Sequence, residues 1–322
     1  MSAGSFWPEP SAQSPEPYGA RGVYRGRFAP SPTGDLHFGS LVAAVASYVD
    51  VRAAHGEWIV RIEDLDTPRV VPGSAESILR TLEVFGFEWS GDVLYQSTRS
   101  DAYEAALVRL FDADAVYYCS CSRAEIQAAQ IHPTQPGDDL FYPGWCRNGV
   151  CMPDRALAVR FRVPAESIRF HDEVQGPIEV DLTTDPGDFV VRRRDGLFAY
   201  QLAVVVDDAA QGITRIVRGA DLLTSTPRQL ALQKSLGFAH PTYAHVPLVT
   251  DKNQIKLSKS AGAGRVDSSQ PCAEIWRALR FLRQSPPLEL RLSGLPTLWE
   301  WAIRNWRVHP MVGIRSAATE VL

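Results

Sequence analysis

The sequence predicts an α/β fold built on a parallel sheet, and three observations support this prediction. Short β-rich runs alternate with segments of helical periodicity over residues 23–85. A turn rich in proline and glycine joins the first such run to the first helix. The chain has 322 residues, 45% of them hydrophobic, which is enough for a large core. This length favours either one large domain with insertions or two domains.

Composition excludes several broad classes of protein. A formal net charge of −4 argues against strong non-specific binding to nucleic acid through overall charge, although a local basic face stays possible. No run approaches the roughly 20 apolar residues that span a bilayer. Residues 1–20 are rich in Pro and Ser and lack the basic start and apolar block of a secretory signal, so we expect a disordered leader. Five cysteines without such a signal indicate a reducing compartment, and we expect a cytoplasmic protein that does not bind membranes.

The first half of the chain follows a strand–helix–strand order. Residues 23–29 predict a short strand. Residues 57–63 alternate and are β-rich, so they predict the next strand. Ser74 is expected to cap a helix that runs to Phe85, with Gly86 just beyond its end. The helix between the two strands is predicted by a buried stripe at helical spacing: Leu41, Val42, Val45, Tyr48 and Val49.

Residues 117–187 interrupt this alternation. They hold four of the five cysteines, together with many prolines and glycines, and show little periodicity. We therefore expect an insertion between two halves of the α/β domain, residues 21–116 and 188–260. Residues 261–322 are expected to form a short helical C-terminal region.

A hairpin is expected directly after the insertion. Residues 188–194 and 197–206 would pair across an Asp195-Gly196 turn. Further expected elements are a strand at 213–217, a helix from Thr226-Pro227 to Gly237, and helices at 273–281 and 298–306.

The run between the first strand and the first helix carries a strong chemical signal. It reads Arg27-Phe28-Ala29-Pro30-Ser31-Pro32-Thr33-Gly34 and is followed by His37-Phe38-Gly39-Ser40. The prolines fix φ, and Gly34 permits a tight or left-handed turn. The start of a helix favours phosphate, and Gly39 leaves room for a flat base against the backbone. In this context His37 is predicted to belong to a nucleotide site, whereas alone it would indicate a polar helix cap.

A second run, Lys256-Leu257-Ser258-Lys259-Ser260, lies far downstream. Its two ammonium groups are three residues apart among small residues, which suits mobile point charges that clamp a triphosphate. Glycines at 262 and 264 add the mobility of a loop that closes over substrate. By itself the run would indicate a solvated basic loop, so its weight comes from pairing with the His37 run.

With these motifs the chain resembles a class I aminoacyl-tRNA synthetase of the glutamyl type. The first motif corresponds to the HIGH-type motif of that family and the second to its KMSKS-type motif. The resemblance implies a Rossmann-type catalytic domain. Ser40 departs from the second histidine of the HIGH motif and offers a hydroxyl instead. Further matching runs lie at 61–66, 198–202, 206–208 and 217–223.

The length of the chain then distinguishes between two branches of this family. A glutamyl-tRNA synthetase continues after its second motif with a large anticodon-binding region, whereas 62 residues follow Ser260 here. The chain therefore resembles the truncated paralogues, the glutamyl-queuosine tRNA(Asp) synthetases, and its segment 301–306 is similar to theirs. The resemblance implies ATP, L-glutamate and queuosine-bearing tRNA(Asp) as partners. It further implies ligase activity. Because the chain is expected to have no anticodon-binding domain that would couple recognition to the active site, we expect glutamyl-adenylate to form without tRNA, and we expect a monomer.

The resemblance also implies roles for individual residues. ATP, accompanied by Mg²⁺, would be bound by Pro30, His37, Gly39, Ser40, Lys256 and Lys259, of which His37, Lys256 and Lys259 would be catalytic. Glutamate would be bound by Arg27, Phe28, Ala29, Pro30, Ser31, Glu63, Tyr200 and Arg218. The two arginines suit its carboxylates, Glu63 its ammonium, and Tyr200 adds a hydroxyl. The alternative for Arg27 and Glu63 is an ion pair at a strand edge. The role of Asp207 and Asp208 stays open.

A cysteine-rich pattern lies within the expected insertion. Its first pair, Cys119-Ser-Cys121, differs from the usual Cys-x₂-Cys zinc knuckle, so the residues alone fit buried thiols equally well. The resemblance implies one structural Zn²⁺ held by Cys119, Cys121, Tyr142 and Cys146. Cys151 competes with Tyr142 for the fourth position, because thiolate is the softer ligand.

Three other functions are weighed against this interpretation. A glutamyl-tRNA(Glu) synthetase is disfavoured by length. A non-catalytic tRNA-binding paralogue would be favoured by loss of His37, Lys259 or the pair Glu63 and Arg218, and all four are present. The third alternative is a nucleotidyltransferase that activates another small acid, and screening of substrates in a pyrophosphate-exchange assay would distinguish it.

Overall fold

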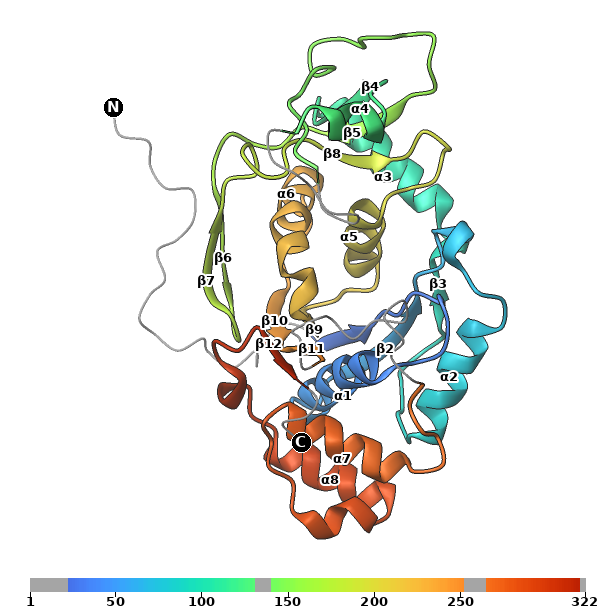
Figure 1. Cartoon of the computed structure of the whole chain (residues 1–322), viewed down its shortest axis with the longest axis vertical. Coiled ribbons are helices and arrows are strands. Elements are labelled where there is room, and N and C mark those ends of the chain that lie inside the picture. The colour runs from blue at the N-terminus through green and yellow to red at the C-terminus, as the bar shows by residue number, and fades with distance from the viewer. Residues whose placement is uncertain (1–22, 131–139, 252–264, 319–322) are drawn as a thin grey trace.

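The computed structural model describes residues 23–130, 140–251 and 265–318, and its centre is a seven-stranded sheet (Figure 1). The strands lie in the order β3-β2-β1-β9-β10-β6-β7. In that order their bounds are Leu94–Tyr95, Glu57–Ile62, Arg25–Phe28, Arg215–Gly219, Thr242–Val246, Ile168–Asp172 and Gly176–Val180. All neighbours are parallel except β6 and β7, which are antiparallel. The predicted α/β fold with a Rossmann-type parallel sheet is confirmed.

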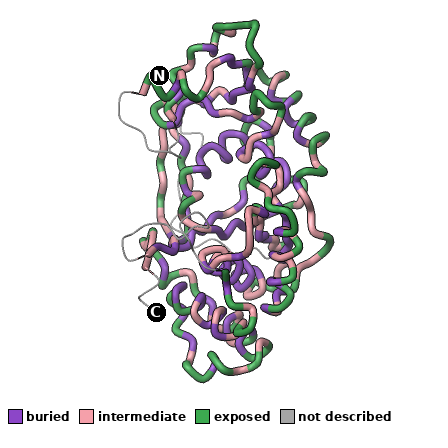
Figure 2. The backbone as a smooth tube through the Cα atoms, turned by 45° about the vertical axis from the view of Figure 1, so that its right-hand side comes forward, coloured by how far each residue is buried: buried purple, intermediate pink, exposed green. Residues whose placement is uncertain are grey.

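Helices cover both faces of this sheet, because side chains along each strand alternate between two cores. Trp58 and Val60 belong to one core, and Ile59 between them belongs to the other. The first face is covered by α1 (Phe38–Ala53), α2 (Ser74–Val84), α7 (Pro271–Phe281) and α8 (Leu295–Asn305); the second is covered by α3 (Ser100–Asp112), α5 (Tyr200–Ala210) and α6 (Thr226–Leu236). Buried residues run through the middle of the molecule and exposed ones lie at its ends and rim (Figure 2). Within the described ranges, none of the helices combines the length and the apolar character that crossing a bilayer requires.

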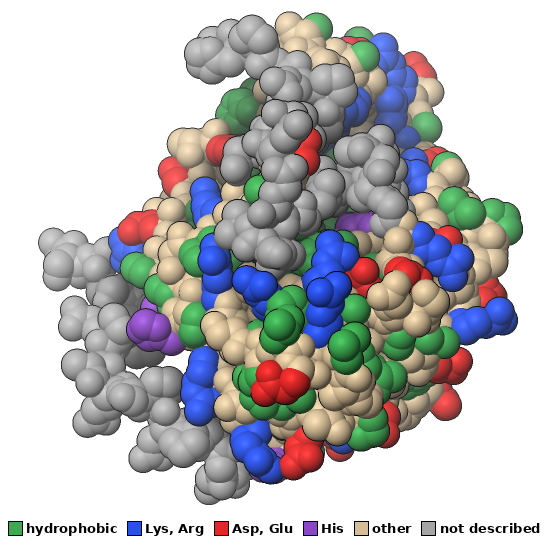
Figure 3. All heavy atoms as spheres, turned by 60° about the horizontal axis from the view of Figure 1, so that its bottom comes forward, with side chains coloured by type: hydrophobic (Ala, Val, Ile, Leu, Met, Phe, Trp, Pro, Cys, Tyr) green, Lys and Arg blue, Asp and Glu red, His purple; other side chains and the backbone are tan. Residues whose placement is uncertain are grey.

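The expected C-terminal helices are present and complete the first core. The ring of Trp299 packs edge-on against Tyr48 and Phe87, with centroid distances of 4.9 and 5.0 Å. Trp306 donates its indole N–H to Asp50 at 3.1 Å. On the face brought forward in Figure 3, basic, acidic and apolar side chains are interspersed. Because of the contacts of Trp299 and Trp306, the C-terminal helices pack onto α1 and belong to the main domain.

A second, smaller sheet lies at the opposite end of the molecule from α7 and α8 (Figure 1). It consists of β4 (Val116–Cys119), β5 (Ala158–Phe161) and β8 (Phe189–Arg192), all antiparallel, and α4 (Arg123–Ala128) follows β4. This pairing crosses the boundary expected at residue 187, since β8 lies beyond it. In addition, β6 and β7 fall within the expected insertion but join the central sheet. Residues 117–187 thus contribute strands to both sheets.

The expected hairpin at 188–206 is wrong in its second half. The turn forms, with Gly196 at φ 88°, but α5 replaces the second strand. The valines of this segment favour a strand by intrinsic propensity. Tertiary packing overrides that preference, because Val204 and Val205 are buried and α5 packs against α3 and α6.

The predicted helix ends are confirmed in two places and wrong in one. Gly237 follows α6 in the left-handed conformation, and Gly86 has φ 73° just beyond α2. Gly73, however, is the N-cap of α2, and Ser74 is its first residue. The hydroxyl of Ser74 instead accepts from the amide of Gly34 at 2.8 Å and donates to its carbonyl at 2.7 Å. Ser74 therefore stabilises the turn before His37 through these hydrogen bonds and does not cap its own helix.

Candidate functional site

A cleft of about 980 Å³ opens at the carboxyl ends of β1 and β9. From these adjacent strands the chain turns to opposite sides of the sheet, and open α/β sheets bind ligands at such a switch point. Lys256 and Lys259 lie outside the described residues. The other residues predicted for ATP and glutamate all line the cleft: Arg27, Phe28, Ala29, Pro30, Ser31, His37, Gly39, Ser40, Glu63, Tyr200 and Arg218.

His37 is the N-cap of α1 and its ring is held by Ser40. The preceding turn passes through Gly34 at φ 130°, a conformation that favours glycine, as predicted. The Nδ1 atom of His37 accepts from the amide of Ser40 at 3.3 Å, and Nε2 lies 3.0 Å from the Ser40 hydroxyl. Because an amide only donates, a neutral His37 ring carries its proton on Nε2. The ring is thus oriented at a helix start, where phosphate is favoured.

Both flanks of the segment 252–264 are anchored beside the His37 turn. On one side, β11 (Leu248–Thr250) lines the cleft and pairs with β12 (Ser316–Ala318). On the other, Arg265 forms an antiparallel bridge with His37, and the amide of Val266 donates to the carbonyl of Leu36 at 3.1 Å. The chain therefore leaves for the second motif and returns from it at the same cleft.

Four charged side chains form a buried network beside the cleft. Arg27 donates to Asp208 Oδ1 at 3.1 Å, and Arg61 donates to the same oxygen at 2.8 Å. Arg61 also lies 3.2 Å from Glu63. Burial acts to raise the pKa of Asp208, but Arg27 and Arg61 hold it below its ordinary value. Burial raises the pKa of Glu63 against the opposing charges of Arg61 and Arg27.

This network gives Arg27 and Glu63 a buried ion pair each, but with different partners. Arg27 pairs with Asp208 and Glu63 pairs with Arg61, so they do not pair with each other, and their role in binding glutamate stays a prediction. The two arginines and two carboxylates balance in charge.

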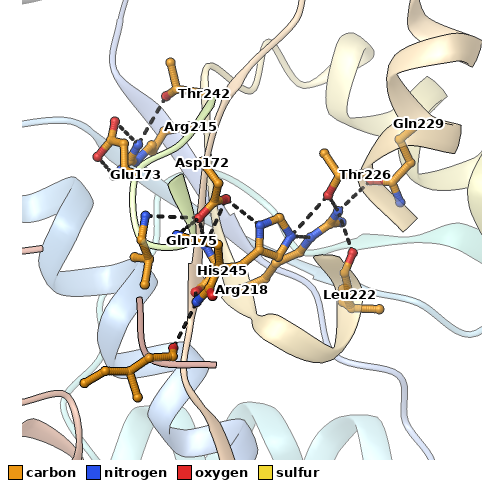
Figure 4. Close-up of polar contacts among 12 residues, drawn as sticks. Asp172, Glu173, Gln175, Arg215, Arg218, Leu222, Thr226, Gln229, Thr242 and His245 are labelled. Carbon is orange, nitrogen blue, oxygen red and sulfur yellow. Dashed lines mark hydrogen bonds and ion pairs between the residues drawn. The ribbon is translucent and has the colours of Figure 1, made fainter. Parts of the chain in front are cut away.

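Arg218 is a buried cation of a different kind, because its hydrogen-bond partners are uncharged. It donates to His245 Nε2 at 3.0 Å, to the Thr226 hydroxyl at 2.9 Å and to the Gln229 side-chain carbonyl at 2.8 Å (Figure 4). Among the described residues no carboxylate lies within ion-pair distance of Arg218, and its Nη1 has no hydrogen-bond partner. Since its side chain is buried and borders the cleft, Arg218 is suited to receive an anion.

The two adjacent aspartates on α5 have separate surroundings. Asp208 faces Arg27 and Arg61, as described. Asp207 accepts from Gln96 at 2.9 Å, from Arg99 at 3.1 Å and from the Tyr103 hydroxyl at 2.6 Å. Asp207 therefore ties α5 to α3 and to the segment before it.

The predicted metal ligands gather in the smaller sheet. The Sγ atoms of Cys119, Cys121 and Cys146 lie within 4.8 Å of one another. The Tyr142 hydroxyl is 3.3 Å from Cys119 Sγ and 3.6 Å from Cys121 Sγ. Tetrahedral Zn²⁺ with its usual bond lengths would set sulfur–oxygen separations of about 3.6 Å and sulfur–sulfur separations of about 3.8 Å. The residues present thus fit a four-coordinate metal, although Cys151 Sγ also lies 3.4 Å from Cys146 Sγ.

Arg160 supplies positive charge next to this cluster. Its Nε donates to Cys119 Sγ at 3.3 Å, and its guanidinium lies 3.8 Å from the centroid of the Tyr142 ring. Because three thiolates and a phenolate would outweigh the two charges of a zinc ion, a buried cation beside them offsets the excess.

Sequence reasoning missed the residues that hold the predicted ones in place. Arg61 carries no predicted role, yet an arginine within an apolar strand requires a buried carboxylate, and that signal was available. Asp172 and His245 have no comparable signal. They are 73 residues apart and meet through the pairing of β6 with β10.

Comparison with known proteins defines the class. Residues 24–274 match the family described as tRNA synthetases class I (E and Q), catalytic domain. The fold and cleft are therefore those of a class I tRNA synthetase catalytic domain. A glutamate-tRNA synthetase from Elizabethkingia anophelis superposes with a TM-score of 0.76 at 24% identity, covering 92% of this chain and 68% of that one. A glutamate tRNA ligase from Elizabethkingia meningosepticum, solved in complex with its amino acid, gives 0.76 at 25% identity over 92% and 67%.

Curated relatives narrow the assignment further. Proteins named glutamyl-Q tRNA(Asp) synthetase from Dechloromonas aromatica and Geobacter sulfurreducens are each 56% identical to this chain. The first match covers 88% of this chain and 94% of the relative, and the second covers 87% and 91%. A relative of the same name from Pseudomonas aeruginosa is 51% identical over 88% of this chain and 93% of its own length. The chain belongs to the glutamyl-Q tRNA(Asp) synthetase family.

Proposed function

We propose that this protein activates L-glutamate with ATP, without requiring tRNA for that step, and transfers the glutamyl group to the queuosine base at the wobble position of tRNA(Asp). The observation that carries the choice of an acidic substrate is Arg218. It is a buried guanidinium at the cleft with uncharged partners and one nitrogen without a partner among the described residues. An anionic side chain or main-chain carboxylate would complete its environment. The names of the curated relatives support glutamate and tRNA(Asp) as substrates.

Glutamate would lie between the charged groups of the cleft. Arg218 and Arg27 would each face one carboxylate, and Glu63 would accept from the ammonium group. Tyr200, whose pKa burial raises, would keep its hydroxyl protonated as a further donor. The neutral network around Asp208 limits how far Arg27 can move, which orients its guanidinium before substrate arrives.

The first reaction is an in-line displacement at phosphorus. An oxygen of the glutamate α-carboxylate bonds to the α-phosphorus of ATP, the bond to the bridging oxygen breaks, and pyrophosphate leaves. Substrate ATP would enter as its Mg²⁺ complex. His37 at the start of α1 would donate to the phosphates, and Lys256 and Lys259 would offset the charge that develops on the leaving group.

The second reaction uses the activated carbonyl. A nucleophilic group of queuosine attacks that carbon, loses its proton, and displaces AMP. The glutamyl group thereby passes to the modified base, and the enzyme is regenerated.

We propose Tyr142 as the fourth ligand of a structural Zn²⁺, together with Cys119, Cys121 and Cys146. Its hydroxyl lies close to two of the three sulfurs, whereas Cys151 is exposed and its Sγ also contacts the carbonyl of Trp145. When bound, the ion would crosslink the smaller sheet to the segment that follows α4. Zinc analysis of purified protein tests this, and a Cys146→Ser variant that retains a full equivalent would contradict it.

Two assays test the main proposal. Glutamate-dependent exchange of pyrophosphate into ATP should proceed without tRNA. Labelled glutamate should then be transferred to tRNA(Asp) that carries queuosine and not to the unmodified tRNA. Exchange that requires tRNA(Glu), with transfer to that tRNA, would favour a glutamyl-tRNA(Glu) synthetase, and transfer independent of queuosine would overturn the acceptor.

A further inference from the structure

A histidine that lies outside the predicted site holds Arg218. His245 is in β10, fully buried, and its Nδ1 lies 2.6 Å from Asp172 Oδ2 (Figure 4). Asp172 ends β6 and pairs in register with Tyr243 of β10. Backbone amides of Val174, Gln175 and His245 donate to the same carboxylate. Asp172 is therefore a fixed acceptor.

This arrangement determines the tautomer of His245. A carboxylate only accepts, so the proton of a neutral ring is on Nδ1, and Nε2 presents a lone pair. Arg218 Nε donates to that lone pair at 3.0 Å. Burial lowers the pKa of His245 to about 4, because the opposing effect of Asp172 is outweighed once the charge of Arg218 adds to burial. His245 is thus neutral near pH 7 and able to accept.

The other hydrogen-bond acceptors around Arg218 all contact a second nitrogen of its guanidinium, Nη2. Its Nη2 donates to Thr226 and Gln229, both on α6, and lies 3.4 Å from the Leu222 carbonyl. Gln229 is in turn fixed by donating to Gln201 at 3.0 Å. With Nε and Nη2 engaged, Nη1 is the nitrogen whose hydrogens are left for a ligand.

We propose that the Asp172–His245 pair is a positioning device for the substrate-binding arginine: it orients the guanidinium of Arg218 so that Nη1 meets a carboxylate of glutamate. This inference rests on the proposed function, since it takes glutamate as the ligand of Arg218. The pairing of β6 with β10 in the central sheet brings Asp172 to His245, so a strand from the expected insertion contributes to this arrangement.

Two substitutions of His245 separate its two contacts. In His245→Asn the side-chain amide can still donate to Asp172. The shorter side chain, however, places no acceptor atom within hydrogen-bond distance of Arg218. In His245→Gln the longer side chain can place its carbonyl oxygen near the position of Nε2. Loss of a hydrogen bond to a buried charged group predicts a KM for glutamate that is about 10- to 100-fold higher in His245→Asn. The KM for ATP should stay unchanged, and His245→Gln should recover much of the affinity for glutamate.

A matched control uses the neighbouring Glu173. Its carboxylate pairs with Arg215, the first residue of β9, and forms no hydrogen bond or ion pair with Arg218 (Figure 4). Glu173→Gln should lower the melting temperature while leaving the KM for glutamate near the wild-type value. An increase in that KM equal to the one in His245→Asn would overturn the positioning role, because it would show a general loss of stability.

The readouts also distinguish the two proposals. Wild-type protein without glutamate-dependent exchange would refute the proposed function, and this inference with it. Wild-type exchange together with an unchanged KM for glutamate in His245→Asn would refute the positioning role alone. The shift in melting temperature produced by glutamate gives an independent measure of binding, and it should be smaller in His245→Asn. If that variant is not recovered folded, Asp172→Asn should change the same two quantities in the same direction, and wild-type values there would overturn the inference.

Discussion

Arg27 and Asp208 form a buried ion pair across 181 residues of sequence, with Arg27 Nε 3.1 Å from Asp208 Oδ1. The same carboxylate holds Arg61 at 2.8 Å. One residue on α5 therefore contacts two arginines, which lie on β1 and β2 beside the cleft, and Glu63 supplies the second negative charge. Arg218 is left as the cation without a charged partner among the described residues.

Asp208→Asn should therefore impair stability and substrate binding together. Removing one partner of a buried ion pair typically costs about 3 to 5 kcal/mol, and here two guanidinium groups lose it. We expect a lower free energy of unfolding in urea and a higher KM for glutamate. Asp207→Asn is the matched control, since Asp207 binds Arg99 and Tyr103 instead. It should lower stability while changing the KM for glutamate less than about twofold, and equal effects of the two substitutions on KM would contradict the assignment.

Local patterns in the sequence were sufficient for three of the seven strands of the central sheet, namely β1, β2 and β9. The alternation at residues 57–63 and the glycine after α6 are local signals, and β2 and the end of α6 follow them. The prediction of a strand at 197–206 is wrong because the valines of this segment favour a strand by intrinsic propensity. Packing against α3 and α6 instead favours the helix α5. Likewise, the hydroxyl of Ser74 is taken by Gly34, 40 residues away.

The residues of the candidate site also fall into two groups, those that local sequence patterns predict and those whose contacts depend on the tertiary fold. Residues in the His37 run could be predicted because a turn, a helix start and a histidine are adjacent in sequence. Asp172 and His245 could not, since their contact depends on which strand lies beside β10. Arg61 lies between these cases, because its buried charge demands a partner but does not identify Asp208.

Lys259→Ala should slow adenylate formation. If Lys259 stabilises charge on the departing pyrophosphate, its loss should lower the rate of glutamate-dependent exchange by about 10²- to 10³-fold. Support comes from the flanks of its segment, since Arg265 pairs with His37 and β11 borders the cleft. Lys252→Ala, in the same segment but outside the motif, serves as control and should exchange near the wild-type rate. An undiminished rate in Lys259→Ala would remove the residue from the mechanism.

Tyr142→Phe and Cys151→Ser should differ in zinc content. The phenylalanine ring keeps the packing against Arg160 but lacks the oxygen that lies near Cys119 and Cys121. We expect Tyr142→Phe to lose zinc to a competing chelator at least about tenfold more readily than the wild type. Cys151→Ser should retain one equivalent of zinc by elemental analysis. The reverse result would make Cys151 the fourth ligand.

Stability should fall as the pH is lowered from about 6.5 to 4, and His245 should account for a defined share of that fall. Its pKa is about 4 in the folded protein against an ordinary value of 6.5, because burial and the charge of Arg218 outweigh Asp172. In this window the unfolded chain binds more protons at this site, so the free energy of unfolding rises with pH, by up to about 3 kcal/mol across the window. Glu63, with its raised pKa, contributes with the opposite sign, so the wild-type profile alone is not diagnostic. The difference between wild type and His245→Gln in urea unfolding at pH 7 and pH 4.5 isolates the histidine, since Glu63 is common to both. The variant should show the shallower dependence on pH, and parallel profiles would mean that His245 is protonated in the folded protein as readily as in the unfolded chain.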